Sequence, residues 1–261
     1  MKHFAIHLPD GARLEGYVHE KSEEMDNTPR PAVIVCPGGA YAYCSDREAD
    51  PVALAFFARG FHSFVLYYPV GEEAQNYRPL ISAARAVSYL RKNAEKYNVA
   101  QIAVCGFSAG GHLALSTALL YDRPELKEAG TGGTECRPDA VILGYPVVTC
   151  SVYTEQMTCM NVTGSKDPTP EREIFSLEKH IRPDTPPVFL WHCVGDTCVP
   201  VENAVMLIEE LQRNRVPYEA HLFADGNHGM SMCTREVGTE DRHVGKWFPM
   251  CCEWLEHLFE F

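Results

Sequence analysis

The sequence has no apolar run long enough to cross a bilayer, and its basic residues are scarce. Its 261 residues include 23 Lys and Arg against 35 Asp and Glu, which gives a formal net charge of −12 at pH 7. Nucleic acids and anionic membranes are bound through basic patches, so this balance argues against both as partners. The lack of a bilayer-length apolar run argues against a membrane-spanning helix. Neutral or cationic small-molecule substrates fit this composition better.

The amino-terminal residues lack the pattern of a secretory signal peptide. The stretch from Met1 to His7 is followed at once by Pro9, Asp10 and Gly11, which are typical of a turn. The eleven cysteines are an odd number and form no framework of spaced pairs. A reducing cytoplasm is the simplest explanation, and we expect most of the thiols to be small buried apolar side chains.

A zinc site has little support in the cysteine spacing. No Cys-x-x-Cys occurs, and Cys193 with Cys198 has no matching second pair. Cys251 and Cys252 are the one close pair. We therefore expect no metal site, and the chemistry inferred below requires no organic cofactor.

Short apolar runs predict a sheet. The length and the 46% share of hydrophobic residues suit one large core, so we expect a single domain over residues 1–261. The alternating segments His3–His7 and Arg13–His19 flank a turn, which predicts an antiparallel hairpin. Six further runs are rich in β-branched and aromatic residues, as in strands buried on both faces of a parallel sheet. They are Pro31–Cys36, His62–Tyr68, Gln101–Cys105, Ala140–Gly144, Val188–Cys193 and Glu219–Phe223.

Helical stretches alternate with these runs. Leu80, Ala83, Ala84 and Val87 recur at the three- and four-residue spacing of a core-facing helix stripe. This alternation predicts an α/β fold, with a mostly parallel sheet of about eight strands and helices on both faces. Ligands in such folds bind at the carboxyl ends of the strands. The helical stretches are Arg47–Arg59, Tyr77–Tyr97, Ala109–Tyr121, Val201–Asn214 and Lys246–Glu260.

Two segments do not fit the alternation. One is Arg123–Pro138, which is rich in Gly and Thr, and the other is Thr149–Pro187, with one helix-like piece at Pro170–His180. The second segment is long for a connection and begins just after a strand end. It is either a cap over a site at that edge, taken as residues 149–187, or an ordinary surface insertion.

One motif carries a specific chemistry. Ser108 lies in Gly106-Phe107-Ser108-Ala109-Gly110, between a predicted strand and a predicted helix. This is Gly-x-Ser-x-Gly in the strand, sharp turn and helix context that presents a nucleophilic serine above a sheet edge. The two glycines permit the tight turn and the close backbone approach. We therefore predict that Ser108 is a catalytic nucleophile, although glycine also marks turns that have no such role.

A serine nucleophile needs a base, and the base needs a carboxylate that orients it. Asp196 and His228 each follow a predicted strand, and they occur in the order Ser, Asp, His. Glu202 and Asp225 are weaker candidates for the acid, because they suit a helix first turn and a turn before glycine. Among the other histidines, we interpret those at positions 112 and 192 as structural.

An oxyanion requires hydrogen-bond donors fixed in advance. One donor is expected to be the backbone N–H of Ala109, directly after the nucleophile. The second is expected from the loop Pro37-Gly38-Gly39-Ala40-Tyr41, where glycines allow close approach to a ligand. Gly39 and Ala40 are the candidates there.

These residues together resemble the α/β-hydrolase superfamily, and within it the small acetyl-xylan-esterase-like, or BD-FAE-like, carbohydrate esterases. The resemblance covers nearly the whole chain. It departs from the family at position 40, where relatives often have a third glycine. The segments that carry it are the loop Pro37–Tyr41, the run Arg47–Ala53, the serine turn, Gly144–Val147, Ser176–His180, and the loops of Asp196 and His228.

The resemblance implies hydrolysis of short acyl esters through an acyl-enzyme, often acetyl groups on xylose-based saccharides. A saccharide site should present aromatic faces, and Tyr41, Tyr43 and Tyr145 lie beside the predicted site loops. Met230 follows the predicted base closely enough to line an acyl pocket. Packing in the core or at the surface is the alternative role for each of these four.

Two other functions remain open at this stage. One is an exopeptidase of the related prolyl-oligopeptidase type. Two observations argue against it: no propeller domain precedes the catalytic part, and no acidic cluster is placed to hold a peptide amine. The other is a ligand-binding protein on an inactive hydrolase fold, which would be expected to lack a triad member. The sequence therefore favours a cytoplasmic serine carboxylesterase that acts on a small-molecule or oligosaccharide ester, and it leaves a homo-oligomer open.

Overall fold

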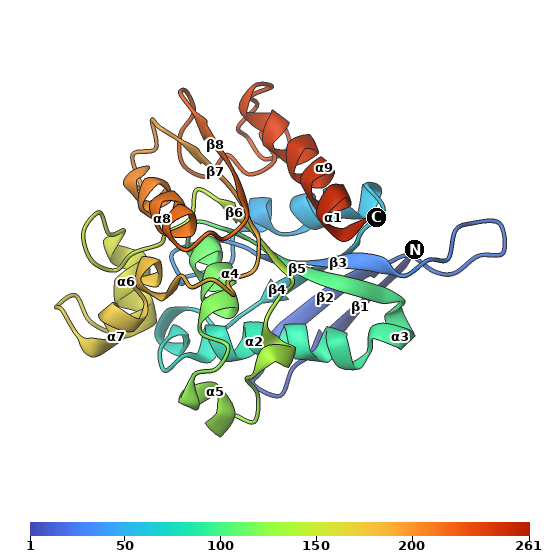
Figure 1. Ribbon diagram of the computed structural model, residues 1–261, viewed down its shortest axis with the longest axis horizontal. Helices are drawn as coiled ribbons and strands as arrows, with labels where there is room; N and C mark the ends of the chain where they lie inside the picture. The colour runs from blue at the N-terminus through green and yellow to red at the C-terminus, as the bar shows by residue number, and fades with distance from the viewer.

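The computed structural model describes all 261 residues, and one eight-stranded sheet runs through its centre (Figure 1). The strand order is β1-β2-β4-β3-β5-β6-β7-β8. β2 pairs antiparallel with β1 and with β4, and all other pairs are parallel. This confirms the predicted mostly parallel sheet with its antiparallel amino-terminal hairpin. The strands are β1 (Lys2–His7), β2 (Arg13–Val18), β3 (Arg30–Cys36), β4 (His62–Tyr67), β5 (Val99–Phe107), β6 (Ala140–Gly144), β7 (Val188–Cys193) and β8 (Tyr218–Phe223).

The central strands are apolar because both faces of the sheet are covered. In β6 all five residues are buried. Val141 and Leu143 pack into one hydrophobic core, while Ala140 and Ile142 pack into the other. Successive side chains of a strand point to opposite faces, so a continuous apolar run supplies both cores at once.

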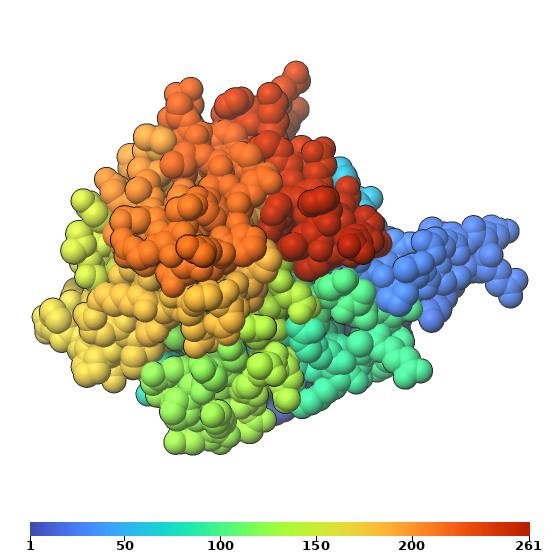
Figure 2. Space-filling view, in the orientation of Figure 1, coloured from blue at the N-terminus to red at the C-terminus, as the bar shows by residue number.

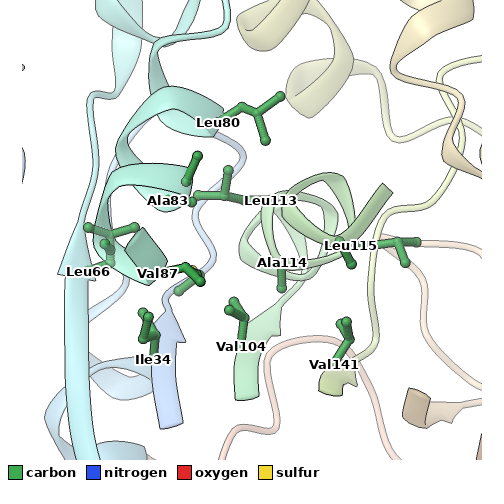
Figure 3. Close-up of a cluster of buried hydrophobic side chains, with 14 of the residues drawn as sticks. Ile34, Leu66, Leu80, Ala83, Val87, Val104, Leu113, Ala114, Leu115 and Val141 are labelled. Carbon is green, nitrogen blue, oxygen red and sulfur yellow. The ribbon is translucent and has the colours of Figure 1, made fainter. Parts of the chain in front are cut away.

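Helices form a layer on each face of the sheet. α2 (Arg78–Lys92), α4 (Ala109–Leu119) and α8 (Glu202–Arg213) pack on one face, and α1 (Asp50–Ala58) and α9 (Trp247–Phe259) pack on the other. Figure 3 shows the first face, where Leu80, Ala83 and Val87 of α2 lie against Leu113 of α4 and the strand residue Val104. Every residue of α4 is buried, which fixes the helix that begins directly after Ser108.

The helix bounds differ from the prediction where local chemistry interrupts a pattern. The stretch predicted at Arg47–Arg59 begins later, as α1, because Pro51 lies in the first turn and suits a helix start. A separate 3₁₀ turn, Asp46–Glu48, precedes it. The long predicted helix Tyr77–Tyr97 is broken at Asn93 into α2 and α3 (Ala94–Tyr97).

Both irregular segments contain short helices. The first holds α5 (Pro124–Glu128) and the 3₁₀ turn Thr134–Cys136. The segment 149–187 holds α6 (Gln156–Thr163), α7 (Pro170–Ile174) and the 3₁₀ turn Leu177–His180, and its yellow atoms form a lobe at one side of the molecule in Figure 2. The first N–H groups of α6, a helix that the sequence pattern does not predict, are capped by the Glu155 side chain.

The cysteines differ from the expectation at one place. Cys150 and Cys159 form a disulfide at the start of the segment 149–187, a pair that the cysteine spacing did not predict. The other nine are free, and seven of them are buried. None of the helices combines the length and the apolar character that spanning a bilayer requires.

Candidate active site

Ser108 lies at the turn between β5 and α4 in a backbone conformation that few non-glycine residues adopt, with φ 54° and ψ −121°. Two glycines make the turn sterically possible. A Cβ at Gly106 would lie 2.0 Å from the Gly110 carbonyl oxygen, and a Cβ at Gly110 would lie 2.0 Å from that of Cys36. The strain is held by the packing around the turn and places the Ser108 hydroxyl at the carboxyl end of the sheet.

The three residues predicted as a triad lie together. Asp196 follows β7, and His228 follows β8. The Asp196 carboxylate accepts a hydrogen bond from Nδ1 of His228 at 2.7 Å. This fixes the tautomer and leaves Nε2 of His228 to accept from the Ser108 hydroxyl at 2.9 Å. A base in contact with a serine hydroxyl and oriented by a carboxylate is the arrangement that makes serine nucleophilic.

Asp196 is buried and surrounded by donors. Its Oδ1 accepts from the backbone N–H groups of Cys198 and Val199, each at 2.9 Å. Burial raises the pKa of Asp196, but hydrogen bonds from His192, His228 and Val199 outweigh it, so the pKa lies well below its usual value. The carboxylate is therefore ionised in the pH range where an imidazole is neutral.

His192 contributes to this site, although sequence analysis treats it as structural. Its Nε2 faces two acceptors, the Val199 carbonyl oxygen at 3.1 Å and Oδ2 of Asp196 at 3.2 Å, so this nitrogen carries the proton. His192 thus helps to orient the carboxylate through Oδ2, the same oxygen that accepts from His228. Its position inside a strand hid this role in the sequence, because register alone does not reveal which loop residue a strand side chain meets.

The other dismissed histidine, His112, is structural. Its Nδ1 accepts from the Tyr41 hydroxyl and its Nε2–H donates to the Phe175 carbonyl oxygen, both at 2.9 Å. Burial lowers its pKa to about 4, so the ring is neutral near pH 7. These bonds connect the loop after β3 to α4 and to the segment 149–187.

The loop after β3 presents free backbone donors. The N–H groups of Gly39, Ala40 and Ala109 have no acceptor within the protein, and Gly39, Ala40 and Ser108 line the same pocket. Gly39 has φ 121°, and Ala40 has φ 53°. Asn161 of α6 donates to the Ala40 carbonyl oxygen at 2.7 Å, a contact that sequence analysis missed because α6 was not predicted.

The pocket above Ser108 has a volume of about 330 Å³. Glu155 and Met157 come from the segment 149–187, so part of that segment forms the rim of the site. Only four of the twelve lining residues are hydrophobic, although most of the exposed wall is apolar, and the ring of Tyr43 is its aromatic face. The lining residues are Gly39, Ala40, Tyr43, Ser45, Arg47, Glu48, Ser108, Glu155, Met157, Cys198, His228 and Gly229.

The predicted substrate-binding residues need correction. Tyr41 is 1% exposed and Tyr145 is fully buried, so neither presents a ring face to a ligand. Met230 is 8% exposed and is not among the lining residues. All three pack in the cores beneath the site, because the loops that carry them turn inward after the strand ends. Tyr43, considered with them, is 57% exposed and does line the pocket.

Comparison with known proteins identifies the family. The model of the BD-FAE family matches residues 20–211. The chain belongs to the BD-FAE family. Its matched region contains β3 to β7 and most of α8, and with them the serine turn, the loop after β3 and Asp196.

Two curated relatives of this BD-FAE chain are xylan-related proteins. The endo-1,4-beta-xylanase B of Butyrivibrio fibrisolvens is 34% identical over 228 residues, which are 85% of this chain and 35% of that protein. The acetylxylan esterase of Xylanibacter ruminicola is 26% identical over 253 residues, which are 89% of this chain and 47% of that protein. The chain therefore spans about a third to a half of the length of these relatives.

A solved structure extends the likeness to the whole fold. The acetyl ester-xyloside bifunctional hydrolase from Caldicellulosiruptor lactoaceticus is 31% identical, with a TM-score of 0.83 over 96% of this chain and 89% of that one. The α/β-hydrolase fold predicted from the sequence is thereby confirmed, and the BD-FAE chain is related to carboxylic ester hydrolases.

Proposed function

We propose that this BD-FAE chain is a serine carboxylesterase that hydrolyses short acyl esters, chiefly acetyl esters, on xylo-oligosaccharides or similar saccharides. The observation that carries the proposal is the continuous hydrogen-bonded series from Asp196 through His228 to Ser108, next to backbone N–H groups without protein acceptors. The relationship to an acetylxylan esterase and to an acetyl ester-xyloside hydrolase supports the substrate class.

In the first half-reaction, the Ser108 oxygen attacks the acyl carbon as its proton passes to Nε2 of His228. The negative charge that develops on the carbonyl oxygen is stabilised by the N–H groups of Gly39, Ala40 and Ala109. Asp196 stabilises the imidazolium that forms. Collapse of the intermediate breaks the ester bond, and His228 gives its proton to the departing sugar alcohol.

In the second half-reaction, water attacks the acyl-enzyme and loses a proton to His228. The tetrahedral intermediate forms in the same oxyanion site, and its collapse releases the acid and returns the proton to the Ser108 oxygen. Each proton that leaves the serine or the water is thus delivered to an oxygen leaving group. The mechanism requires no metal or organic cofactor.

The shape of the pocket suits a small acyl group on a polar alcohol. Its volume of about 330 Å³ lies at the lower end of the range for small-molecule sites. The exposed ring of Tyr43 offers an aromatic face for a sugar, and the polar groups of Ser45, Arg47 and Glu155 offer hydrogen bonds to hydroxyls.

The test is a series of initial rates on p-nitrophenyl esters from acetate to octanoate, run beside acetylated xylo-oligosaccharides. We expect kcat/KM to be highest for acetate and acetate to be released from the sugar, because each added methylene that fits poorly costs about 1–3 kcal/mol. A preference for longer acyl chains, with no acetate released from the xylo-oligosaccharides, would contradict the assignment of saccharide esters as substrates. Cleavage of an aminoacyl p-nitroanilide at a comparable rate would favour an exopeptidase instead.

A further inference from the structure

Glu48 is a buried carboxylate beside the site whose role lies outside the triad. It ends the 3₁₀ turn Asp46–Glu48 and is 3% exposed. Burying a charged group is expensive unless hydrogen bonds and opposite charges compensate for the lost water. The contacts of Glu48 therefore indicate what the protein gains from keeping a carboxylate here.

The first contact fixes the oxyanion loop. Oε2 of Glu48 accepts from the backbone N–H of Gly38 at 2.8 Å. The fit is close, because a Cβ at Gly38 would lie 2.6 Å from that oxygen and 3.1 Å from the Cβ of Ser108. The N–H of Gly38 thus points back to Glu48, while the next two N–H groups along the chain have no protein acceptor. The carboxylate sets which donors of this loop are left for a ligand.

The second contact reaches the loop that carries the base. Oε1 of Glu48 accepts from the Tyr145 hydroxyl at 2.6 Å, and that hydroxyl oxygen accepts from the backbone N–H of Ser231 at 2.9 Å. The Tyr145 ring also packs against the His228 imidazole, with ring centroids 4.9 Å apart and an interplanar angle of 66°. Glu48 therefore connects the donors of the oxyanion to the support of the base.

The charges around Glu48 come from several elements. Arg47 is the cation that faces it, His228 becomes one when it takes the serine proton, and the ionisable but neutral groups around it are Tyr145, Tyr68 and Cys105. Burial raises the pKa of Glu48, whereas the bonds from Tyr145 and Gly38 and the charges of His228 and Arg47 lower it without cancelling the effect of burial. A negative charge at this position attracts the imidazolium that forms during the reaction.

We propose that Glu48 is a positioning residue for acyl transfer: it holds the Gly38 and Tyr145 sides of the site in register, and its charge supports the protonated His228. The proposal rests on the proposed serine-hydrolase function. Its distinguishing consequence is an effect on turnover and on pH dependence, because Glu48 itself does not touch the reacting atoms.

The main test compares wild type with Glu48→Gln on p-nitrophenyl acetate from pH 5 to 9. The variant keeps the size of the side chain but replaces one acceptor oxygen with a donor and removes the charge, so either the contact with Gly38 breaks or the bond with Tyr145 reverses its direction. We expect kcat to fall at least tenfold with KM within about threefold, as for a lost charge-assisted hydrogen bond. The acid limb of the kcat/KM profile should move to lower pH, because the anion near the base is gone.

Asp46→Asn is the matched control, because it removes a carboxylate from the same 3₁₀ turn at an exposed position. It should leave kcat and the pH profile unchanged. A Glu48→Gln enzyme with wild-type kcat would overturn the proposal. A Glu48→Gln enzyme that loses thermal stability while the acid limb of its kcat/KM profile stays in place would also overturn the proposal, because a purely structural role gives that pattern.

A second variant covers the case in which Glu48→Gln does not fold. Tyr145→Phe keeps the carboxylate and removes the hydroxyl that relays it to Ser231, so kcat should fall about tenfold. A Tyr145→Phe enzyme with wild-type kcat would overturn the proposed connection from Glu48 through Tyr145 to the loop that carries His228.

The rate of Ser108 labelling by a fluorophosphonate provides a readout that needs no ester substrate. It should slow at least tenfold in Glu48→Gln even if the wild type proves to hydrolyse none of the esters tested. An unchanged labelling rate would overturn the role of Glu48, whereas inert wild-type protein on all esters would overturn only the proposed function.

Discussion

At the scale of single residues, the site depends on a buried carboxylate that stays ionised, that of Asp196. Asp196 accepts from two backbone N–H groups and two imidazoles, and these contacts outweigh the effect of burial on its pKa. A carboxyl whose pKa is lower in the folded than in the unfolded state stabilises the fold above its unfolded pKa, near 3.9. That contribution is lost as the pH falls through the folded value.

Asp196→Asn should therefore lower the free energy of unfolding by about 1.5–3 kcal/mol at pH 7, the range for a lost hydrogen bond to a charged group. The gap between the variant and the wild type should shrink as the pH falls below about 4, where unfolded Asp196 becomes protonated. Urea unfolding of both proteins between pH 3 and pH 7 measures this difference in the free energy of unfolding. A gap that stays constant with pH would show that the contribution comes from packing and not from charge.

The three residues of the proposed triad could be picked out in the sequence because their signals are local. Ser108 sits in a five-residue motif, and Asp196 and His228 each follow a strand in the expected order. Glu48 could not be given a role in this way, since its partner Tyr145 lies 97 residues away and their contact depends on how separate strand ends meet. His192 lies only four residues before Asp196, but the contact depends on the path of the loop after β7, which no periodicity reveals.

At the scale of elements, the sequence predicts what periodicity encodes. The strands appear within two residues of their predicted bounds, and the five helical stretches appear with shifted or broken ends. Inside the segment 149–187, α6 was missed because its residues, Gln-Met-Thr-Cys-Met-Asn-Val-Thr, include several poor helix formers. Its stability comes from the Glu155 cap and from the Cys150–Cys159 bond.

This bond gives a prediction for the rim of the pocket. Cys159→Ser should retain the triad and lower the free energy of unfolding by up to about 3 kcal/mol, the loop-closure contribution for so short a loop. The freed start of α6 carries Glu155 and Met157, so KM for acetylated xylo-oligosaccharides should rise more than kcat falls. Dithiothreitol should reproduce the effect in the wild type.

Dithiothreitol added to the Cys159→Ser variant is the control, because that variant has no Cys150–Cys159 bond left to reduce. A wild type that responds no more to reduction than the variant would contradict a role for this disulfide at the rim.

At the scale of the whole molecule, one hydrophobic core lies on each face of the sheet. Together they hold the carboxyl ends of β3, β5, β7 and β8 at the same edge. The serine turn, the loop after β3, and the loops of Asp196 and His228 all leave the sheet at carboxyl ends of parallel strands. Four loops far apart in sequence thereby form one site. The cytoplasmic location and the possibility of a homo-oligomer stay predictions from the sequence.

The substrate side of the site was the least predictable part. Tyr41 and Tyr145 lie beside site loops in the sequence, yet both turn into the core, while Tyr43 reaches the pocket. Neighbouring positions in an irregular loop carry no periodicity, so the direction of each side chain is decided by tertiary packing alone.

The measurement that tests the central claim most directly is the steady-state hydrolysis of p-nitrophenyl acetate by the wild type and by Ser108→Ala, with circular dichroism to verify that both are folded. The account predicts saturable hydrolysis by the wild type and a loss of kcat on the order of 10³ to 10⁶ in the variant. A folded Ser108→Ala protein that keeps most of the wild-type rate would contradict the assignment of Ser108 as the nucleophile.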